Sequence, residues 1–288
     1  MLKIAILYPN KMVRLTQWGH PSDTCEKLFV TDANSFNELV PQADCAMIIH
    51  RFDMDLVKSI KKPIVFFYGD YRPELNYQTL TLMSMAKIVL TTWYREDIYS
   101  EFNAFAVRQG VNPDIWKPIP GCPEEHDVVF SGNNHGSDLR LNILEKLNND
   151  FNLFIVGRNW PSYFNSTNKK TPLATNKFLN RGKVNVGIFN KRDNSNVKFL
   201  TSNRLYQGMA CGKPHIGPHT IGLRSYFRPD DCYMDYTNYK DLKKTINKLL
   251  KNKKLRTNAA KAQRAAIVRE NTVWHAWKRM ETIIANNI

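Results

Sequence analysis

The sequence has 288 residues, 43% of them hydrophobic and 23% charged, with a formal net charge of +15. This balance excludes wholesale disorder, and no apolar run approaches the ~20 residues that a membrane span requires. The five cysteines show no C-x-x-C spacing, so we expect reduced thiols and a cytoplasmic location rather than a disulfide framework or a zinc site.

Short apolar segments alternate with helical patterns through the first hundred residues, which indicates a parallel sheet covered on both faces. The predicted strands are Leu2–Tyr8, Asp44–His50, Pro63–Tyr68 and Lys87–Thr91. The predicted helices are 22–29, which Ser22 or Asp23 would cap, Thr79–Ala86 and Tyr94–Phe102.

Four prolines and two glycines interrupt regular structure between Gly110 and Pro123, after which the same alternation restarts. The predicted strands here are Asp127–Phe130, Phe151–Val156, Lys183–Phe189 and Lys213–Gly217. The predicted helices are Leu139–Leu147, Ser202–Cys211, Asp241–Leu250 and Lys254 to the end. We therefore expect two α/β domains joined by a proline-rich hinge. Ligands of such sheets bind beyond the carboxyl ends of the strands, which places the expected site in a cleft between the domains.

Three segments of the second half resemble motifs of one enzyme family. Gly110-Val-Asn-Pro-Asp-Ile-Trp-Lys-Pro118 resembles the junction between the two domains of GT-B glycosyltransferases. The segment Arg204-Leu-Tyr-Gln-Gly-Met-Ala-Cys-Gly-Lys-Pro214 resembles their donor-site helix, and Ile221-Gly-Leu-Arg-Ser-Tyr-Phe227 the glycine-led loop that faces the donor sugar. The pattern is most similar to family-4-like and spore-maturation-protein-B-like glycosyltransferases, and it covers Gly110 to the C terminus.

This resemblance implies an α/β fold of two Rossmann-like domains that face each other across a cleft, the GT-B fold. Residues 1–117 would form the acceptor domain and residues 118–270 the nucleotide-sugar domain, and residues 271–288 would form a helix that crosses back to the first domain. The implied enzyme is a glycosyltransferase whose donor is a nucleotide-diphosphate sugar, with a UDP-sugar expected. No metal or other cofactor is required.

The expected donor site gathers groups that suit a diphosphate. The turn at Gly132 and Asn133 follows a strand and precedes a helix, where backbone N–H groups bind anions. Arg204 lies in the first turn of the donor helix, and Arg158 follows another strand. In the glycine-led loop, Gly222 permits close backbone approach, and the N–H groups of Leu223 and Arg224 would then face the same anion.

Two positions depart from the family pattern. Gln207 stands where relatives carry a glutamate that accepts hydrogen bonds from the ribose hydroxyls, and a glutamine amide is a weaker, neutral acceptor. Arg224 or Ser225 stands where many relatives carry a glutamate in the glycine-led loop. An altered donor is one explanation for both losses. The other is a catalytically inactive GT-B protein that binds nucleic acid.

The first domain should supply the groups near the acceptor. Asp70, directly after the third strand, is our first candidate for the base that takes the acceptor proton, although it would also suit a turn cap beside Gly69. His20 is the second candidate, and Gly19 and Arg72 are candidates for acceptor binding. The segment Asp53-Met-Asp55 has the spacing of a D-x-D metal motif, but its position at the start of a helix favours a cap. We predict no metal site.

The charge is distributed unevenly along the chain. Residues 1–117 hold 13 basic and 13 acidic residues, residues 118–239 hold 15 and 10, and residues 240–288 hold 13 and 3. A basic field of this kind attracts polyanions. Compositional drift in a Lys-, Asn- and Ile-rich sequence would produce the same excess.

Two classes of acceptor follow from this charge. Some bacteriophages encode small GT-B enzymes that place sugars on hydroxymethylated pyrimidines, and the basic charge of this short chain resembles that group. DNA is therefore our preferred acceptor, held by its phosphates while a base rotates out of the stack. The alternative is a small, lipid-linked or protein acceptor, which the neutral first domain favours. The sequence carries no signal of oligomeric state.

Overall fold

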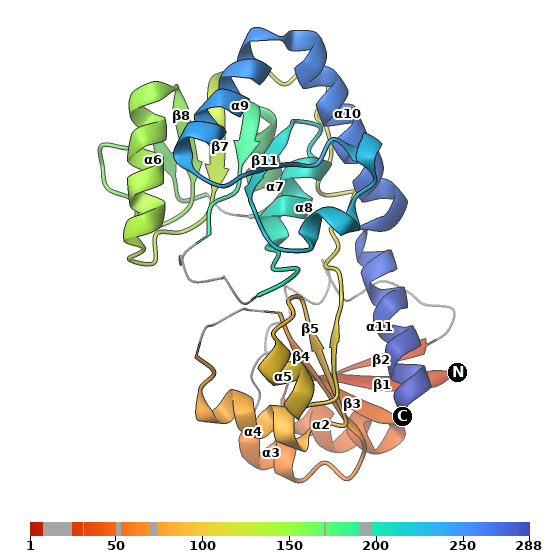
Figure 1. The fold of residues 1–288 in the computed structure, drawn as a ribbon. Coiled ribbons are helices and arrows are strands. Elements are labelled where there is room, and N and C mark those ends of the chain that lie inside the picture. Colours follow the sequence, from red (N-terminus) through yellow and green to blue (C-terminus); the bar gives the residue numbers. More distant parts are fainter. Residues whose placement is uncertain (8–24, 31, 50–52, 70–73, 170, 190–196) are drawn as a thin grey trace. The chain divides into compact units, whose positions relative to one another are not determined.

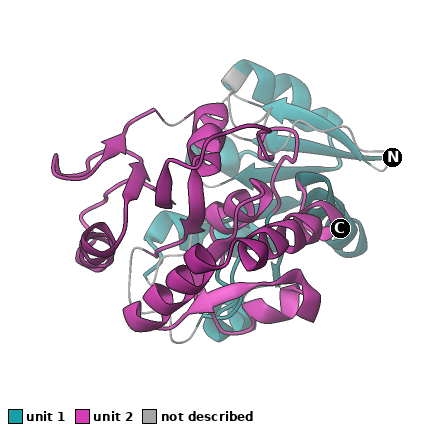
Figure 2. Ribbon diagram, turned by 90° about the horizontal axis from the view of Figure 1, so that it is seen from above, with its two compact units in different colours: residues 1–109, 195–200, 273–288 teal, residues 110–194, 201–272 magenta. Residues whose placement is uncertain are grey.

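The protein is described here from a computed structural model that covers residues 1–7, 25–30, 32–49, 53–69, 74–169, 171–189 and 197–288. The chain divides into two compact units, which are coloured separately in Figure 2. Unit 1 consists of Met1–Gln109, Ser195–Leu200 and Val273–Ile288, and unit 2 consists of Gly110–Asn194 and Thr201–Thr272. We predicted limits after residues 117 and 270, and the chain passes between the two units after Gln109 and after Thr272.

Unit 1 contains a six-stranded parallel sheet with the strand order β2-β1-β3-β4-β5-β6 (Figure 1). Its strands are β1 Leu2–Leu7, β2 Cys25–Val30, β3 Cys45–Ile49, β4 Ile64–Tyr68, β5 Ile88–Thr91 and β6 Ala104–Ala106. Every residue of β3, β4 and β5 is buried, as expected for parallel strands covered on both faces.

The helices of unit 1 are α2 Ala33–Leu39, the 3-10 turn η2 Val40–Gln42, α3 Met54–Lys58, α4 Tyr77–Met85, α5 Glu96–Glu101 and α11 Val273–Asn287. Helix α11 comes from the end of the chain, yet it lies beside the sheet of unit 1 (Figure 1). Its apolar side chains pack into the core of this sheet. Trp277, Met280 and Ile284 are each less than 5% exposed and join Ile4 and Met47 in one cluster. The C-terminal helix is thus a structural part of unit 1.

Unit 2 contains a second six-stranded parallel sheet, with the order β12-β11-β10-β7-β8-β9. Its strands are β7 His126–Ser131, β8 Leu153–Val156, β9 Ser166–Thr167, β10 Gly182–Val186, β11 His215–Pro218 and β12 Met234–Tyr236. The chain moves from β7 to β8 on one side and returns to β10 on the other. The topological switch point therefore lies between β7 and β10.

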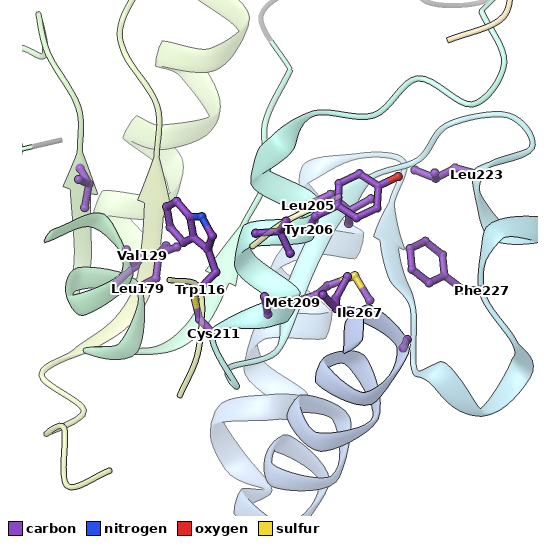
Figure 3. Close-up of a cluster of buried hydrophobic side chains, with 14 of the residues drawn as sticks. Trp116, Val129, Leu179, Leu205, Tyr206, Met209, Cys211, Leu223, Phe227 and Ile267 are labelled. Carbon is purple, nitrogen blue, oxygen red and sulfur yellow. The ribbon is translucent and has the colours of Figure 1, made fainter. Parts of the chain in front are cut away.

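Helices cover both faces of the second sheet. They are α6 Asp138–Asp150, α7 Pro172–Asn180, α8 Asn203–Ala210, α9 Tyr239–Lys251 and α10 Lys253–Glu270, with the 3-10 turns η3 Leu223–Tyr226 and η4 Pro229–Asp231. Helices α6 and α9 share one apolar cluster, and α7, α8 and α10 share the other. Figure 3 shows Leu205, Tyr206 and Met209 of α8 between Trp116 on one side and Leu223 and Phe227 on the other.

The main error of the sequence analysis lies at residues 22–29, where we expected a helix. Residues Cys25–Val30 form β2, which pairs in parallel with the whole of β1. Its Glu26 and Lys27 lie on an edge strand where charge is tolerated, and that charge disguised the strand pattern. The sequence analysis also missed α2, β6, β9, α7 and β12.

Candidate functional site

The polar residues that we predicted for the second unit follow strands at the carboxyl edge of its sheet. Gly132 and Asn133 come directly after β7, and Arg158 follows β8. Since β7 borders the switch point, the turn after it lies at the position where open α/β sheets generally bind ligands.

Close backbone packing fixes the turn at Gly132. Its N–H donates to the carbonyl oxygen of Val156 at 2.9 Å, and its own carbonyl oxygen accepts from Nε1 of Trp160 at 2.8 Å. The prediction that this N–H binds an anion is therefore wrong, because the sheet already pairs it. A Cβ added to Gly157 would lie 1.8 Å from the Gly132 carbonyl oxygen. Only glycine at position 157 therefore allows the chain after β8 to approach this turn.

The structure also brings Asn133 and Arg158 together. The Oδ1 atom of Asn133 accepts a 3.1 Å hydrogen bond from the backbone N–H of Arg158, and the N–H of Asn134 donates to the Arg158 carbonyl oxygen at 3.0 Å. The Arg158 side chain is exposed, and among the described residues its guanidinium has no hydrogen bond or ion pair. These contacts join the loops after β7 and β8 into one surface that carries an exposed cation.

Arg204 lies at this surface, as the sequence predicted. A Cβ added to Gly132 would be 3.2 Å from Nε of Arg204, and the Cζ atom of Arg204 is 5.9 Å from the centroid of the Phe130 ring. The helix that carries Arg204, α8, begins at this edge with a cap residue, Ser202, whose side chain makes no capping hydrogen bond. The first N–H groups of α8 and the Arg204 guanidinium are thus presented at the same end.

A second arginine, Arg140 of α6, approaches the same aromatic ring and was not predicted. Its Cζ atom is 5.5 Å from the Phe130 centroid, and its side chain is only 1% exposed. It donates to the carbonyl oxygens of Asn133 at 2.7 Å and Ile188 at 3.1 Å. Arg140 thereby links the loops that follow β7 and β10 on the two sides of the switch point.

The two guanidinium groups lie in a region with little compensating negative charge. Burial, followed by the positive charge of Arg204, lowers the pKa of Arg140 to about 9, and burial lowers the pKa of Arg204 to about 10. Within the described ranges, neither arginine pairs with a carboxylate. Buried cations without an anion are costly, so this arrangement suits a ligand that supplies negative charge.

Orphaned polar atoms give the same indication. Nε of Arg140, Oγ1 of Thr201 and Oγ1 of Thr220 are buried and have no hydrogen-bond partner in the described part of the chain. Thr201 precedes the cap of α8 and Thr220 follows β11, so both belong to the carboxyl edge. Native proteins leave few buried polar atoms unsatisfied, and such atoms cluster where a ligand or water binds.

The glycine-led loop agrees with the sequence analysis in part. Gly222 has φ +77°, a conformation that favours glycine, and it begins the turn η3. The prediction that the N–H of Leu223 faces the anion is wrong, because this N–H donates to the Thr220 carbonyl oxygen at 3.2 Å. The Leu223 side chain lies in the core (Figure 3). The exposed side chain of Arg224 forms an ion pair with Asp235 at 3.0 Å.

Gln207 is half-buried on α8, one turn after Arg204. Its backbone carbonyl accepts hydrogen bonds within the helix end, whereas its side-chain amide has no partner among the residues that the structure describes. The amide is therefore available to a ligand at the carboxyl edge.

The candidates of unit 1 cannot be placed. Asp70, His20, Gly19 and Arg72 all lie outside the described residues. The carbonyl oxygen of Gly69, at the end of β4, accepts a 2.8 Å hydrogen bond from Oγ1 of Thr92.

Asp53 caps α3, which is the role that the sequence analysis favoured over a D-x-D metal site. Its Oδ1 atom accepts hydrogen bonds from the N–H groups of Asp55 at 2.9 Å and Leu56 at 3.2 Å. Across the described ranges, no group of three His, Cys, Asp or Glu side chains could hold a metal ion. Nor do these ranges contain a helix whose length and apolar character would let it traverse a bilayer.

Sequence reasoning missed Arg140 because its helix reads as an ordinary amphipathic segment with a charged outer face. One feature of the sequence could have indicated it: Arg140 is the third residue of α6, in the turn that Ser137 caps. Side chains in the first turn of a helix after a strand lie near the ligand edge.

Comparison with known proteins extends this description. The profile of a family described as glycosyl transferase-like matches residues 140–284, which is half of the chain. A search of curated proteins finds no match to the sequence.

Several solved structures share the fold across nearly the whole length of both chains. Sucrose-phosphate synthase from Thermosynechococcus elongatus has 12% identity and a TM-score of 0.65, with 99% of each chain covered. HepE from Anabaena, solved with UDP and glucose, has 10% identity and a TM-score of 0.68, with 99% of this chain and 100% of that chain covered. An alpha-glucosyltransferase solved with UDP and a 13-mer DNA that contains an HMU base has 11% identity and a TM-score of 0.67, with 99% of each chain covered. These similarities confirm the predicted fold class, two parallel-sheet α/β domains of the GT-B type.

Proposed function

Because the chain belongs to the glycosyl transferase-like family, we propose that it transfers a sugar from a UDP-sugar to an acceptor hydroxyl, and that unit 2 binds the donor. The observation that carries this proposal is the pair Arg140 and Arg204, two guanidinium groups near one phenylalanine ring without a carboxylate in the described structure. A diphosphate supplies the missing charge.

The residues of the carboxyl edge then take separate roles. Arg204 binds the diphosphate beside the turn at Gly132 and Asn133, and the exposed Arg158 contacts it from the loop after β8. Gln207 accepts a hydrogen bond from a ribose hydroxyl through its amide carbonyl. Gly222 lets the backbone of the following loop approach the sugar.

Uridine is the preferred nucleotide because similar structures were solved with it. HepE was solved with UDP-glucose and with UDP and glucose, and an alpha-glucosyltransferase was solved with UDP. The general rule that open α/β sheets bind ligands at the carboxyl ends of their strands supports a nucleotide site at this edge.

The preferred acceptor is a hydroxymethylated pyrimidine in DNA, as in enzymes that bacteriophages encode. One of the similar structures contains DNA with an HMU base. The strongly basic end of the chain adds a physical reason, since residues 240–288 hold 13 basic and 3 acidic residues.

Exposed lysines account for much of this charge. On α9 and α10, the exposed lysines without an acidic partner in the described structure are Lys240, Lys244, Lys248, Lys251, Lys253, Lys254 and Lys261. The junction of the two helices lies at the amino edge of the sheet, because Arg256 pairs with Glu124, just before β7, at 3.0 Å. These lysines would hold flanking DNA and leave the carboxyl edge to the donor.

Unit 1 would provide the acceptor side. We assign Asp70, after β4, as the base that takes the proton of the acceptor hydroxyl, and His20 as the alternative base. Gly19 and Arg72 would contact the acceptor. The equal numbers of acidic and basic residues in 1–117 favour the second candidate function, transfer to a small, lipid-linked or protein acceptor.

Two measurements test this proposal. Calorimetry and thermal shift with UDP, ADP and GDP, each alone and as its glucose or mannose conjugate, should show selective stabilisation by the uridine ligands. Binding of none of them would overturn the donor assignment. Measurable hydrolysis of a nucleotide sugar would reject the further alternative, an inactive GT-B nucleic-acid-binding protein.

The acceptor is tested by sugar incorporation into matched DNA duplexes that carry hydroxymethylcytosine, hydroxymethyluracil or the unmodified bases. Incorporation only into the hydroxymethylated duplexes would support DNA. Donor hydrolysis without transfer to any duplex would direct the search to other acceptors. A steep loss of duplex affinity with salt, reduced when Lys248, Lys251 and Lys254 are changed to Gln, would locate the DNA contact.

A further inference from the structure

His219 stands at the carboxyl edge of unit 2 as the first residue after β11. Its backbone N–H donates to the Tyr236 carbonyl oxygen at 2.8 Å, which holds the residue beside the end of β12. Its side chain is half-exposed, and Nδ1 lies 2.8 Å from Oδ2 of Asp235. Both the backbone and the ring of His219 are therefore fixed by the neighbouring strand.

Asp235 determines which nitrogen of His219 carries the proton. A carboxylate only accepts hydrogen bonds, so the neutral ring donates from Nδ1 and keeps a lone pair on Nε2. The other oxygen of Asp235, Oδ1, accepts from Arg224 at 3.0 Å, which holds the carboxylate in place. Nε2 has no partner among the described residues, and it is an oriented hydrogen-bond acceptor.

This acceptor lies at the same end of unit 2 as the candidate donor site. The helix that carries Arg204 begins at the carboxyl edge and packs against β11, where a Cβ on Gly217 would be 3.8 Å from Leu205. His219 lies two residues after Gly217 along the chain and three residues before Gly222, whose loop follows. Parallel strands end at one edge, so His219 follows β11 at the edge of the sheet where α8 begins.

We propose that His219, oriented by Asp235, recognises the sugar of the donor. Its Nε2 atom accepts a hydrogen bond from one of the sugar's hydroxyl groups. The proposal rests on the proposed function, since it assumes that a nucleotide sugar binds at this edge. It identifies His219 as a specificity residue and Asp235 as its positioning residue.

The hydrogen-bonding groups of a sugar support this role for His219. A sugar presents hydroxyl groups that donate hydrogen bonds, and a selective site must offer acceptors to them. In the glycine-led loop, the side chain after Leu223 is Arg224, which only donates and is already paired with Asp235. The next side chain, Ser225, donates to the Gly222 carbonyl oxygen at 2.7 Å. The free Nε2 of His219 is the nitrogen acceptor that this cluster presents.

The test compares UDP with UDP-glucose, because only the second ligand carries the sugar. Their affinities are measured by calorimetry for the unaltered protein, His219→Ala, Asp235→Asn and a control, Asp230→Asn. Asp230 is exposed in the same β11–β12 connection, and its side chain makes no hydrogen bond or ion pair within the described residues. Thermal unfolding checks that each variant is folded.

We expect His219→Ala to weaken UDP-glucose binding about 5- to 20-fold while UDP binding changes less than about 2-fold. Asp235→Asn should give a loss of the same kind, because an amide can donate to Nδ1 and move the proton to Nε2. His219→Gln should recover much of the affinity, since its amide oxygen accepts hydrogen bonds. Asp230→Asn should bind both ligands as the unaltered protein does.

Equal weakening of UDP and UDP-glucose would overturn the inference, because a purely structural role affects both ligands alike. Unchanged binding of both ligands by folded His219→Ala would overturn it as well. Failure of the unaltered protein to bind either ligand is a different result, since it refutes the donor assignment itself. The two failures are therefore distinguishable in one set of titrations.

Discussion

The guanidinium of Arg140 donates a 2.7 Å hydrogen bond to the carbonyl oxygen of Asn133, so that a buried cation on α6 holds the turn after β7 in place. A second hydrogen bond to Ile188 extends this support to the loop after β10. One side chain thus braces both loops of the switch point, and the shape of the proposed diphosphate site depends on it.

Replacing Arg140 with Met should damage both stability and donor binding. The carbonyl oxygens of Asn133 and Ile188 would lose their donor, which costs about 1–3 kcal/mol of unfolding free energy. Loss of the brace and of a nearby charge should weaken UDP binding at least about 10-fold. Urea unfolding and calorimetry measure the two effects. Asn142→Ala, an exposed change on the same helix, is the control and should alter neither.

Arg204 should behave differently from Arg140, because it makes no hydrogen bond within the described structure. Arg204→Met removes a desolvated cation, so the unfolding free energy should stay within about 1 kcal/mol of its original value or rise. UDP binding should fall by about 10- to 100-fold, as expected for a lost charge-assisted hydrogen bond. Lys261→Gln, which removes an exposed charge of α10, should leave UDP binding intact. A strongly destabilised Arg204→Met variant would contradict this account.

The sequence predicted the central strands of both sheets because strands buried on both faces are continuous apolar runs. The segments Cys45–Ile49 and Ile64–Tyr68 are examples in which every residue is buried. Edge strands lack this signal. Cys25–Val30 carries two charged residues on the outer strand β2 and follows two residues that favour helix caps, so its pattern suggested a helix.

Residues of the candidate site could be placed from the sequence where their position next to a strand or at the start of a helix is enough to locate them. Gly132 directly follows β7 and Arg204 lies in the first turn of α8, and the two residues lie close together in the structure. Arg140 was missed because its burial depends on how α6 packs against Phe130, which is a tertiary contact without a local pattern. The bonded N–H of Leu223 was missed because it depends on the exact turn at Thr220.

Gly157→Ala should disrupt the site through backbone contact alone. The added methyl group would lie 1.8 Å from the carbonyl oxygen of Gly132, so the turn after β7 must move. We expect the unfolding free energy to fall by about 2–4 kcal/mol. The affinity for UDP should fall by a larger fraction than the unfolding free energy does. Gly121→Ala is the matched control, because Gly121 has φ +71° but no atom within 4 Å of an added Cβ. That change should cost about 1 kcal/mol and leave UDP affinity unchanged.

His215 should make the protein sensitive to acid. Its ring is buried against α8, where a Cβ on Gly208 would lie 2.1 Å from Nδ1, and this nitrogen has no partner among the described residues. Burial, and then the positive charge of Arg204, lower the pKa of His215 to about 3, from an ordinary value of 6.5. Between these values the unfolded chain binds a proton that the folded chain excludes, so folding stability falls as the pH is lowered.

The expected slope is at most about 1.4 kcal/mol per pH unit from this one group, over the range from about pH 6 down to pH 4. Urea unfolding at a series of pH values measures it. His215→Asn cannot titrate, so its stability should fall less steeply with acid, even though its stability at pH 7.5 is lower. His135→Gln removes an exposed histidine and should keep the original slope. Parallel acid profiles for the original protein and His215→Asn would show that the neutral buried ring does not control acid stability.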